Sequence, residues 1–371
     1  MGRKILVTGG AGFIGSHLAD ELLEHGYGVK VLDNLNPQVH GEERRVPEYL
    51  DSKVEFIRGD VCNPEHVKEA LEGVDAVFHF AAAVGVGQSM YQVQKYTRVN
   101  NLGTAVLMEQ LIEKGIRKLI VASSMSIYGE GLYLDKAGSR VNRAERSLQQ
   151  LKNGIWELAD DQGADLRPIP TPESKQPFLA SVYALSKYDQ ERMSLMLGRA
   201  YRIPTVALRF FNVYGSRQAL SNPYTGVLAI FASRLLNNKS PHIFEDGNQR
   251  RDFVSVKDVV RGCRLVLESS AADSVFNIGS GTSYTVNDIA SQVARALGKE
   301  DISPVVSGKY RVGDIRHCFS DITRAREVLG YEPRIDLAQG LSELTGWLKG
   351  QIAYDHLDKA NAELKQRGLA V

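Results

Sequence analysis

The sequence is poor in cysteine, with only Cys62, Cys263 and Cys318 in 371 residues. Their wide spacing matches no metal-binding motif and favours buried, reduced thiols over a disulfide framework, so we expect no metal site. No apolar run reaches the ~18 residues of a membrane helix. Residues 1–4 lead directly into an expected strand, which leaves no room for a signal peptide. These absences predict a cytoplasmic protein with no membrane partner.

An excess of charge of one sign is also absent, because 45 Lys and Arg residues stand against 44 Asp and Glu residues. The formal net charge of +1 gives no broad positive field of the kind that attracts nucleic acid. We therefore expect no nucleic-acid partner, and any phosphate on a ligand must be met by a few placed groups. At ~100–200 residues per domain, the length allows two domains or one large fold with a second lobe.

Short apolar and β-branched runs alternate with stretches of helical periodicity through the first half of the chain. Continuous apolar strands between helices are typical of a parallel sheet covered on both faces. We therefore predict an α/β fold with a doubly wound parallel sheet in residues 1–210 and a smaller C-terminal α/β lobe in residues 211–371, parts of which return to the first domain. Strands are expected at 4–8, 28–32, 54–57, 76–80, 118–122 and 205–210, and helices at 13–25, 64–71, 93–113 and 181–201.

The alternation stops between residues 130 and 176. This stretch carries mixed charges, scattered glycines and a turn-rich run from Pro168 to Pro172, with a short helix expected around residues 143–151. A long irregular excursion inside a compact domain is usually a functional lid or a disordered loop. We predict that residues 130–176 are an insertion that acts as a lid over a ligand.

A glycine-rich turn follows the first expected strand and opens the first helix, with Gly9, Gly12 and Gly15 in it. Gly9 permits a tight turn, Gly12 lets a pyrophosphate approach the backbone, and Gly15 lets the helix pack close to the sheet. The helix N-terminus offers free N–H groups to the phosphates. A glycine triplet alone is a weak signal, but its place between strand and helix predicts a dinucleotide site.

Asp33 ends the second expected strand and suggests which dinucleotide binds. A carboxylate there accepts hydrogen bonds from both ribose hydroxyls and repels a 2′-phosphate. No arginine follows before Arg44, so the pattern favours NAD over NADP. The alternative is a plain glycine turn followed by a helix-capping aspartate.

Tyr183 and Lys187 lie four residues apart on an expected helix, so their side chains share one face. A phenol with a pKa near ~10 is a poor base at pH 7, and a nearby ammonium and a nicotinamide ring lower that pKa. Ser124 ends the fifth expected strand, at the edge where ligands bind in such sheets. A lone Tyr-x-x-x-Lys pair usually lies on a surface; combined with the glycine turn and Ser124, it predicts catalysis.

Together these motifs resemble those of the extended short-chain dehydrogenase/reductases of the NAD-dependent epimerase/dehydratase family, over nearly the whole chain except residues 130–176. The matching motifs are Thr8-Gly9-Gly10-Ala11-Gly12-Phe13-Ile14-Gly15, Asp33-Asn34, Gly59-Asp60, Phe80-Ala81-Ala82, Asn100, Ser123-Ser124, Tyr183-x-x-x-Lys187 and Arg209-Phe210-Phe211-Asn212. The resemblance implies a Rossmann-type fold, NAD as cofactor, and Ser124, Tyr183 and Lys187 as catalytic residues. It places the cofactor against Gly9, Gly12, Phe13, Ile14, Gly15, Asp33, Asn34, Asp60, Val61, Phe80, Ala81, Ala82, Asn100, Ala122, Tyr183, Lys187 and Phe210.

The resemblance also implies that residues 211–371 form a nucleotide-sugar-binding lobe. Asn212 matches an asparagine that contacts a sugar diphosphate, and Arg251 matches an arginine that grips phosphate. Arg311 and Asp314 match an element that adds a second phosphate clamp and a ribose contact. Bidentate arginines suit a diphosphate, although one taken alone is as often a solvated surface charge. The expected substrate contacts are Val84, Ser124, Met125, Ser126, Asn212, Arg251, Arg311 and Asp314.

The residues after Ser124 bear on which reaction of the family is expected. Family dehydratases carry an Asp-Glu pair there and decarboxylases a glutamate at the position of Ser126, whereas this chain has Met125 and Ser126. The resemblance therefore implies a nucleotide-sugar 4-epimerase that forms a transient 4-keto sugar by reversible hydride transfer. A 4-dehydrogenase or ketoreductase needs the same parts and is the alternative. A non-catalytic dinucleotide-binding regulator is an alternative of a different class.

Two further expectations follow from the resemblance. Val84 replaces a lysine that glucose/galactose epimerases often carry, and residues 123–131 with Pro170-Thr171-Pro172-Glu173 resemble a dTDP-L-rhamnose 4-epimerase subgroup. The expected substrate is dTDP-L-rhamnose or a related dTDP- or UDP-hexose.

The second expectation is a homodimer, which forms through a four-helix interface made by the helices at 93–113 and 181–201. The apolar candidates, each of which could instead be intramolecular core, are Leu102, Val106, Leu107, Leu111, Met193, Leu195, Met196 and Leu197.

Overall fold

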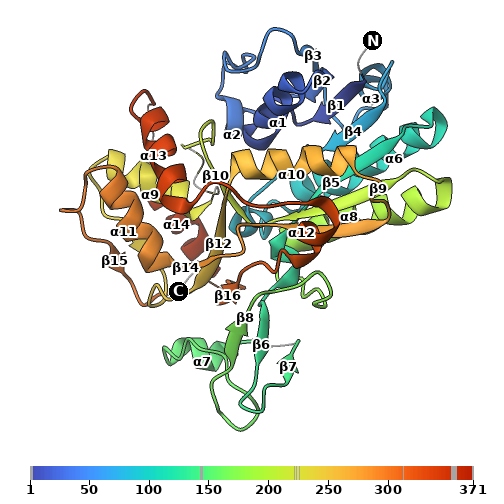
Figure 1. Cartoon of the computed structure of the whole chain (residues 1–371). Coiled ribbons are helices and arrows are strands. Elements are labelled where there is room, and N and C mark those ends of the chain that lie inside the picture. The colour runs from blue at the N-terminus through green and yellow to red at the C-terminus, as the bar shows by residue number, and fades with distance from the viewer. Residues whose placement is uncertain are drawn as a thin grey trace.

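A seven-stranded parallel sheet forms the centre of the protein in the computed structural model (Figure 1). The structure describes residues 3–142, 145–220, 222, 224, 226–311, 313–351 and 357–369. The strand order is β13-β9-β5-β4-β1-β2-β3. Strands β2 and β3 are added on one side of β1 and β4 on the other, and this change of side creates a crevice at the carboxyl ends of β1 and β4. The strands are β1 Lys4–Thr8, β2 Gly28–Asp33, β3 Glu55–Arg58, β4 Ala76–His79, β5 Lys118–Ser124, β9 Thr205–Phe210 and β13 Ser274–Ile278.

Helices cover both faces of this sheet, because successive strand residues point to opposite sides. In β1, Ile5 and Val7 belong to one buried cluster and Leu6 to another. The first cluster lies under α1 (Phe13–Glu24), α10 (Val256–Glu268) and α12 (Thr323–Leu329). Helices α3 (Pro64–Ala70), α6 (Gly103–Lys114) and α8 (Val182–Tyr201) lie on the other side. The Rossmann-type α/β fold predicted from the sequence is confirmed.

The expected helix at 93–113 consists of three pieces. These are α5 (Val93–Tyr96), a π-helical stretch (Thr97–Leu102) and α6. The π-helical stretch carries Asn100, which is fully buried. Single π-helical turns inside α-helices often occur at functional sites.

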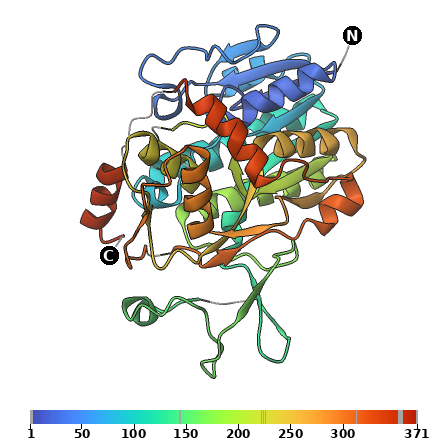
Figure 2. The same ribbon diagram turned by 60° about the vertical axis from the view of Figure 1, so that its left-hand side comes forward.

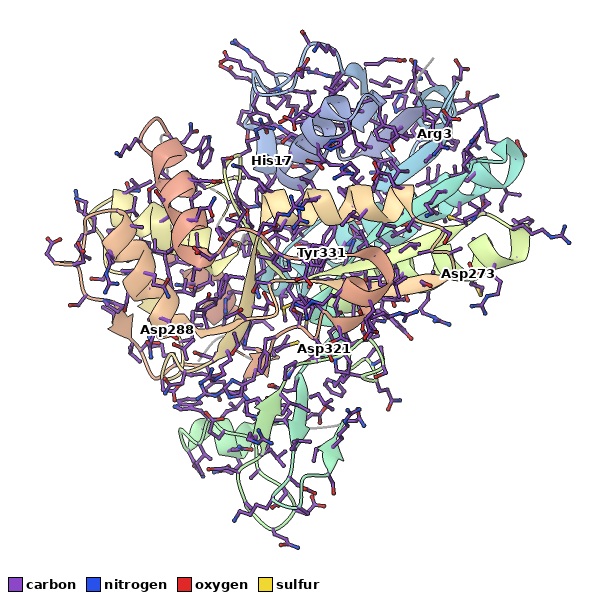
Figure 3. The ribbon with its side chains drawn as sticks, in the orientation of Figure 1. Arg3, His17, Asp273, Asp288, Asp321 and Tyr331 are labelled. Carbon is purple, nitrogen blue, oxygen red and sulfur yellow. The ribbon has the colours of Figure 1, made fainter. Side chains whose placement is uncertain are left out.

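The chain crosses back into the main sheet after residue 211. β13 pairs in parallel with β9, and α10 packs against α1. Tyr331, which follows α12 and packs against Gly262 of α10, donates a hydrogen bond from its phenol to the carbonyl of Gly279 at 2.9 Å (Figure 3). Parts of residues 211–371 therefore lie in the sheet and helix layers of the first domain, and not in the second lobe.

The second lobe has its own apolar core, formed by α9 (Val227–Leu236), α11 (Val286–Ala296) and α13 (Leu337–Leu348). Its small sheets join β10 (Asn212–Tyr214), β14 (Ser283–Thr285) and β16 (His317–Cys318) to β12 (Arg250–Ser255), and β11 (His242–Ile243) to β15 (Val305–Val306). The C-terminal helix α14 (Leu357–Gln366) lies beside this lobe (Figure 1).

Most of residues 130–176 project from the body as a small unit of their own (Figures 1 and 2), whereas Thr171 and Lys175 near the end of this range are buried in the body. They contain a three-stranded antiparallel sheet of β7 (Arg140–Val141), β6 (Leu132–Leu134) and β8 (Arg167–Ile169), and the helix α7 (Leu148–Lys152). The sequence did not indicate these strands, since two or three residues are too few to show alternation. Residues 143–144 of the expected helix lie outside the described part of the chain.

No helix within the described residues is long and apolar enough to cross a membrane. A cytoplasmic location stays a prediction.

Candidate active site

A cavity of about 670 Å³ runs along the carboxyl edge of the main sheet and reaches the second lobe. One side is lined by the turn after β1, the segments after β4 and β5, and α8. The other side is lined by residues from β10, β12, the segment after β11 and α14. Ligand sites of this size, placed where strand order reverses, are typical of dinucleotide-binding sheets.

The glycine turn forms one end of this cavity. Gly9 has a φ of +70°, and a Cβ there would lie 2.8 Å from the amide nitrogen of Ala81. A Cβ on Gly15 would fall on the carbonyl oxygen of Gly9. Gly12 and the first three residues of α1, Phe13 to Gly15, line the cavity, where free N–H groups can bind phosphate. The turn therefore fits the pyrophosphate of NAD.

Asp33 lies at the end of β2, in the wall beside the glycine turn. Its carboxylate accepts hydrogen bonds from the N–H groups of Ala11 (3.1 Å) and Leu35 (2.9 Å), which hold it in place. His40 Nε2 lies 3.7 Å from Asp33 Oδ1. Burial lowers the pKa of His40 against the opposing charge of Asp33, which favours the neutral ring. A fixed carboxylate at this point fits the ribose hydroxyls of NAD.

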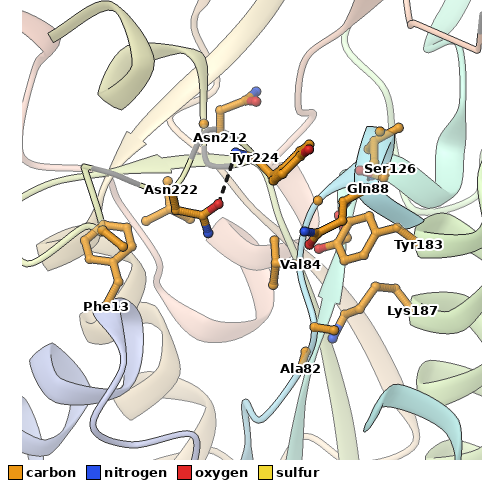
Figure 4. A pocket seen from close by; sticks show the side chains of 18 of the residues that line it. Phe13, Ala82, Val84, Gln88, Ser126, Tyr183, Lys187, Asn212, Asn222 and Tyr224 are labelled. Carbon is orange, nitrogen blue, oxygen red and sulfur yellow. Dashed lines mark hydrogen bonds between the residues drawn. The ribbon is translucent and has the colours of Figure 1, made fainter. Parts of the chain in front are cut away.

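Helix α8 presents Tyr183 and Lys187 to the cavity from one face (Figure 4). Ser181 caps the N-terminus of the helix, because its Oγ accepts the N–H of Ala184 at 3.1 Å. Ser124, at the end of β5, lies close enough to the Tyr183 phenol to lower its pKa, and it accepts the N–H of Ser126 at 3.1 Å. The structure thus joins the three residues for which the sequence predicted catalysis.

The pKa of Tyr183 is raised, whereas the sequence predicted that it would be lowered. Burial raises the pKa of Tyr183, and the hydrogen bond from Ser124 opposes that shift only in part. Burial also lowers the pKa of Lys187 to about 7, against the opposing charge of Glu191. Desolvation disfavours both charged forms, so the protein alone does not hold the phenolate that the sequence argument assumed.

A chain of buried polar side chains supports Lys187 from behind. Lys187 Nζ donates to Gln190 Oε1 at 2.7 Å, and Gln190 Nε2 donates to Thr104 Oγ1 at 2.8 Å. The ring of His79 lies between Thr104 (3.0 Å) and Thr8 (2.8 Å) at hydrogen-bonding distance. These hydrogen-bonded side chains link Lys187 to Thr8 at the end of β1, directly before the glycine turn. Sequence reasoning missed Gln190, although it lies one helical turn after Lys187.

Asn100 is the predicted cofactor residue that does not line the cavity. Its amide accepts the N–H of Ala83 at 2.7 Å and donates to the Ala83 carbonyl at 3.1 Å and to Ser186 Oγ at 2.8 Å. It therefore ties the segment after β4 to α8 from behind the wall. All other predicted cofactor and substrate residues line the cavity.

The second lobe contributes two arginines to the cavity wall. Arg311 pairs with Asp314 at 2.9 Å, and its guanidinium lies 4.6 Å from the ring centre of Phe244. Arg251 donates to the carbonyls of Ile315 and Arg316. Asn212, on β10, donates to the carbonyl of Asp252 at 2.9 Å. These groups can meet a diphosphate and the nucleoside attached to it.

Helix α14 closes part of the cavity, a role that the sequence did not indicate, although a helical tail was expected from Leu337 onward. Leu364 would contact a Cβ on Gly87 at 3.3 Å. The phenols of Tyr91 and Tyr224 lie 2.5 Å apart, and both donate to Glu363 Oε2, at 3.0 and 3.2 Å. No local pattern marks these contacts, because they join three distant parts of the chain. The lining residues from this end of the chain are Leu357, Asn361, Leu364 and Leu369.

None of the described residues between 130 and 176 lines the cavity. A lid would require this unit to move from the position shown in Figures 1 and 2, so the lid stays a prediction.

The model of the NAD dependent epimerase/dehydratase family matches residues 5–147 and 160–279. The chain belongs to this family. A dTDP-L-rhamnose 4-epimerase of Burkholderia thailandensis is 34% identical over 356 residues, which cover 95% of this chain and 96% of that protein.

Solved structures of similar proteins extend the comparison. The UDP-glucose 4-epimerase of Thermotoga maritima, solved with UDP-glucose, has a TM-score of 0.76 and 33% identity, and the match covers 93% of this chain and 98% of that one. The UDP-glucuronic acid 4-epimerase of Bacillus cereus, solved with UDP-glucuronic acid and NAD, has a TM-score of 0.75 and 29% identity, with coverages of 93% and 99%.

Proposed function

We propose that the protein is an NAD-dependent nucleotide-sugar 4-epimerase. The observation that carries this proposal is the meeting of Ser124, Tyr183 and Lys187 in one cavity with a glycine turn at one end and two arginines at the other. The cofactor end fits NAD and the lobe end fits a nucleotide diphosphate. The reacting sugar carbon belongs between them, beside the phenol.

The chain's own groups then handle the proton of the sugar hydroxyl. Tyr183 Oη takes the proton from the C4 hydroxyl as general base and later returns it, while Ser124 Oγ hydrogen-bonds the same oxygen. In its protonated form Lys187 Nζ, held by Gln190, supplies a positive charge that favours the phenolate. When bound, the nicotinamide ring supplies reversible oxidation of the sugar carbon and a further positive charge. Turning of the 4-keto sugar before reduction inverts C4.

Epimerisation is favoured over elimination by the acids that the cavity contains. The carboxylates among its described lining residues are Asp33, Asp60 and Asp314. Asp33 and Asp60 lie at the cofactor end, and Asp314 is paired with Arg311. Next to the phenol stand Met125 and Ser126 instead of the acids that dehydration needs. Net oxidation or reduction at C4 uses the same parts and is the second candidate. A non-catalytic regulator would not need the trio.

For the substrate we propose dTDP-L-rhamnose, with related dTDP- and UDP-hexoses as the other candidates. Support comes from the relative of Burkholderia thailandensis and from Val84, half-exposed in the cavity wall where a lysine was expected for glucose/galactose epimerases. The substrate contacts proposed are Val84, Ser124, Met125, Ser126, Asn212, Arg251, Arg311 and Asp314.

We also propose a homodimer. Of the apolar candidates, Leu102 and Met196 are 48% and 63% exposed, and Leu185 on α8 is 46% exposed. They lie on the helices expected at the interface, whereas Val106, Leu107, Leu111 and Leu195 are buried in the protomer. Light scattering at micromolar concentration should give twice the chain mass of 41.0 kDa; a monomer mass would contradict the dimer.

The experiment that tests the function is incubation of the purified protein with dTDP-L-rhamnose, UDP-glucose or UDP-galactose, without added nicotinamide. Proton NMR distinguishes C4 epimers because axial and equatorial hydrogens couple differently. We expect a C4 epimer from at least one of these sugars, with dTDP-L-rhamnose favoured. Turnover that requires added NAD or NADH would support the dehydrogenase or ketoreductase instead.

A further inference from the structure

A buried group of charged side chains lies where the insertion meets the second lobe. We call it the charge cluster, and it joins segments that are far apart in the sequence. Three members have side chains only 4%, 1% and 0% exposed, namely Arg146, Glu245 and Arg316. The cluster consists of Glu130, Arg146 and Glu157 from the insertion, Glu245 and Asp246 after β11, and Arg316 and His317 at β16.

Arg146 is the contact that the insertion makes with two different segments of the lobe. Its Nη1 donates to Glu245 Oε1 at 2.6 Å, and its Nη2 donates to the backbone carbonyl of Asp314 at 2.8 Å. Its Nε lies 3.7 Å from Glu130 Oε1. One planar guanidinium therefore fixes the distance between the segment after β11 and the segment before β16.

Glu130 and Glu157 of the insertion bind residues at β16. Glu130 accepts the backbone N–H groups of Arg316 (2.7 Å) and His317 (3.1 Å). Glu157 binds the ring of His317 at 2.9 Å and the guanidinium of Arg316. Arg316 also pairs with Glu245 at 3.0 Å. The insertion thus holds both the backbone and the side chains of β16.

On its far side the cluster touches the wall of the cavity. No cluster member lines the cavity, but three contacts of the cluster end at or next to a residue that does. Glu245 directly follows Phe244, the ring under Arg311. Asp314, whose carbonyl binds Arg146, carries the carboxylate that pairs with Arg311. The Arg316 carbonyl accepts from Arg251.

We propose that residues 130–176 are a positioning element for the nucleotide diphosphate of the substrate, and that Arg146 is its central residue. From behind the cavity wall, Arg146 holds Phe244, Arg311 and Asp314 in the arrangement that receives the ligand. The proposal rests on the proposed function, because it assumes that this end of the cavity binds a nucleotide diphosphate.

The cluster consists of charged side chains, which supports a role in positioning the cavity wall rather than one of only holding the insertion against the second lobe. Apolar packing would join the two units at least as strongly, because desolvation offsets much of the gain from a buried ion pair. Ion pairs and charged hydrogen bonds instead fix distance and angle. In this protein such interactions join the insertion to the second lobe directly behind Arg251 and Arg311 of the cavity wall.

The test is the Arg146→Met variant of the full-length protein with its cofactor. Binding of dTDP and of UDP is measured by titration calorimetry, and kcat and KM are measured for the sugar that the wild type converts. We expect the Kd of the bound nucleotide and KM to rise about tenfold, the scale of one hydrogen bond to a charged group. We expect kcat to stay within about twofold and NAD content to stay unchanged, because Tyr183 and the glycine turn are not touched.

Arg167→Met is the matched control, because Arg167 is an exposed arginine of the same insertion outside the cluster. It should leave both constants unchanged. Arg146→Lys should recover part of the affinity, since an ammonium can bind Glu245 but lacks the fork that also reaches Asp314. If Arg146→Met does not fold, the double variant Arg146→Met/Glu245→Gln lowers the unpaired charge and should show the same loss of affinity.

Unchanged nucleotide affinity in a folded Arg146 variant would overturn the proposal, and so would a loss confined to kcat. A wild type that binds neither dTDP nor UDP would overturn it as well. A wild type that binds nucleotide but epimerises no sugar would contradict the proposed function alone, and the calorimetric comparison would still decide the role of Arg146.

Discussion

Replacing Tyr183 by phenylalanine should lower kcat about a thousandfold, within the range of roughly 10²–10⁴ that a positioned general base contributes. The change removes one oxygen, the phenol oxygen beside Ser124 in the cavity. The aromatic ring and its edge-on packing against Tyr96, with ring centres 6.4 Å apart, remain. Substrate conversion is followed by NMR at saturating nucleotide sugar.

The same variant should keep its NAD and its thermal stability, which separates loss of chemistry from loss of structure. Tyr201→Phe is the matched control, because Tyr201 is an exposed tyrosine at the end of the same helix; it should keep full activity. A Tyr183→Phe protein that retains more than about a tenth of the wild-type kcat would show that another group moves the proton.

Replacing Gly15 by alanine should lower the NAD content of the purified protein about ten- to hundredfold, the scale of roughly 1–3 kcal/mol for forcing a methyl group into a packed site. The new Cβ would fall on the carbonyl oxygen of Gly9 and lie 2.6 Å from the Cα of Gly10. Both are backbone atoms, so the turn must move away from the helix. NAD is measured by chromatography after the protein is denatured.

Gly28→Ala is the matched control, because Gly28 lies on β2 beside β1, the strand that leads into the glycine turn. Its Cβ would meet Lys4 at an ordinary 3.8 Å, so NAD content should match the wild type. Full retention of NAD by Gly15→Ala would mean that the close approach of α1 to the turn does not govern cofactor binding.

The cofactor end of the site could be predicted from the sequence because its determinants are local. Gly9, Gly12 and Gly15 lie within seven residues, and Tyr183 and Lys187 lie within one helical turn. In each case spacing along the chain fixes geometry, through a tight turn or a helix face. Ser124 could be placed because a strand end of a parallel sheet is a known position in space.

The substrate end depends on contacts that no local pattern encodes. The Tyr91–Tyr224–Glu363 contact and the charge cluster each join segments that are far apart in the sequence. The insertion seemed irregular because its strands have only two or three residues. The direction of the Tyr183 pKa was also missed, since burial can be read only from the folded chain.

The most direct test of the central claim uses a nucleotide sugar that carries deuterium at C4, incubated with the protein as purified. An epimerase that keeps its cofactor returns the same hydrogen to the same carbon. We predict that the C4 epimer retains its deuterium and that none appears in added free nicotinamide cofactor. Loss of deuterium from C4 into a free nicotinamide, with a keto sugar or no epimer as product, would contradict the account and identify a net oxidation.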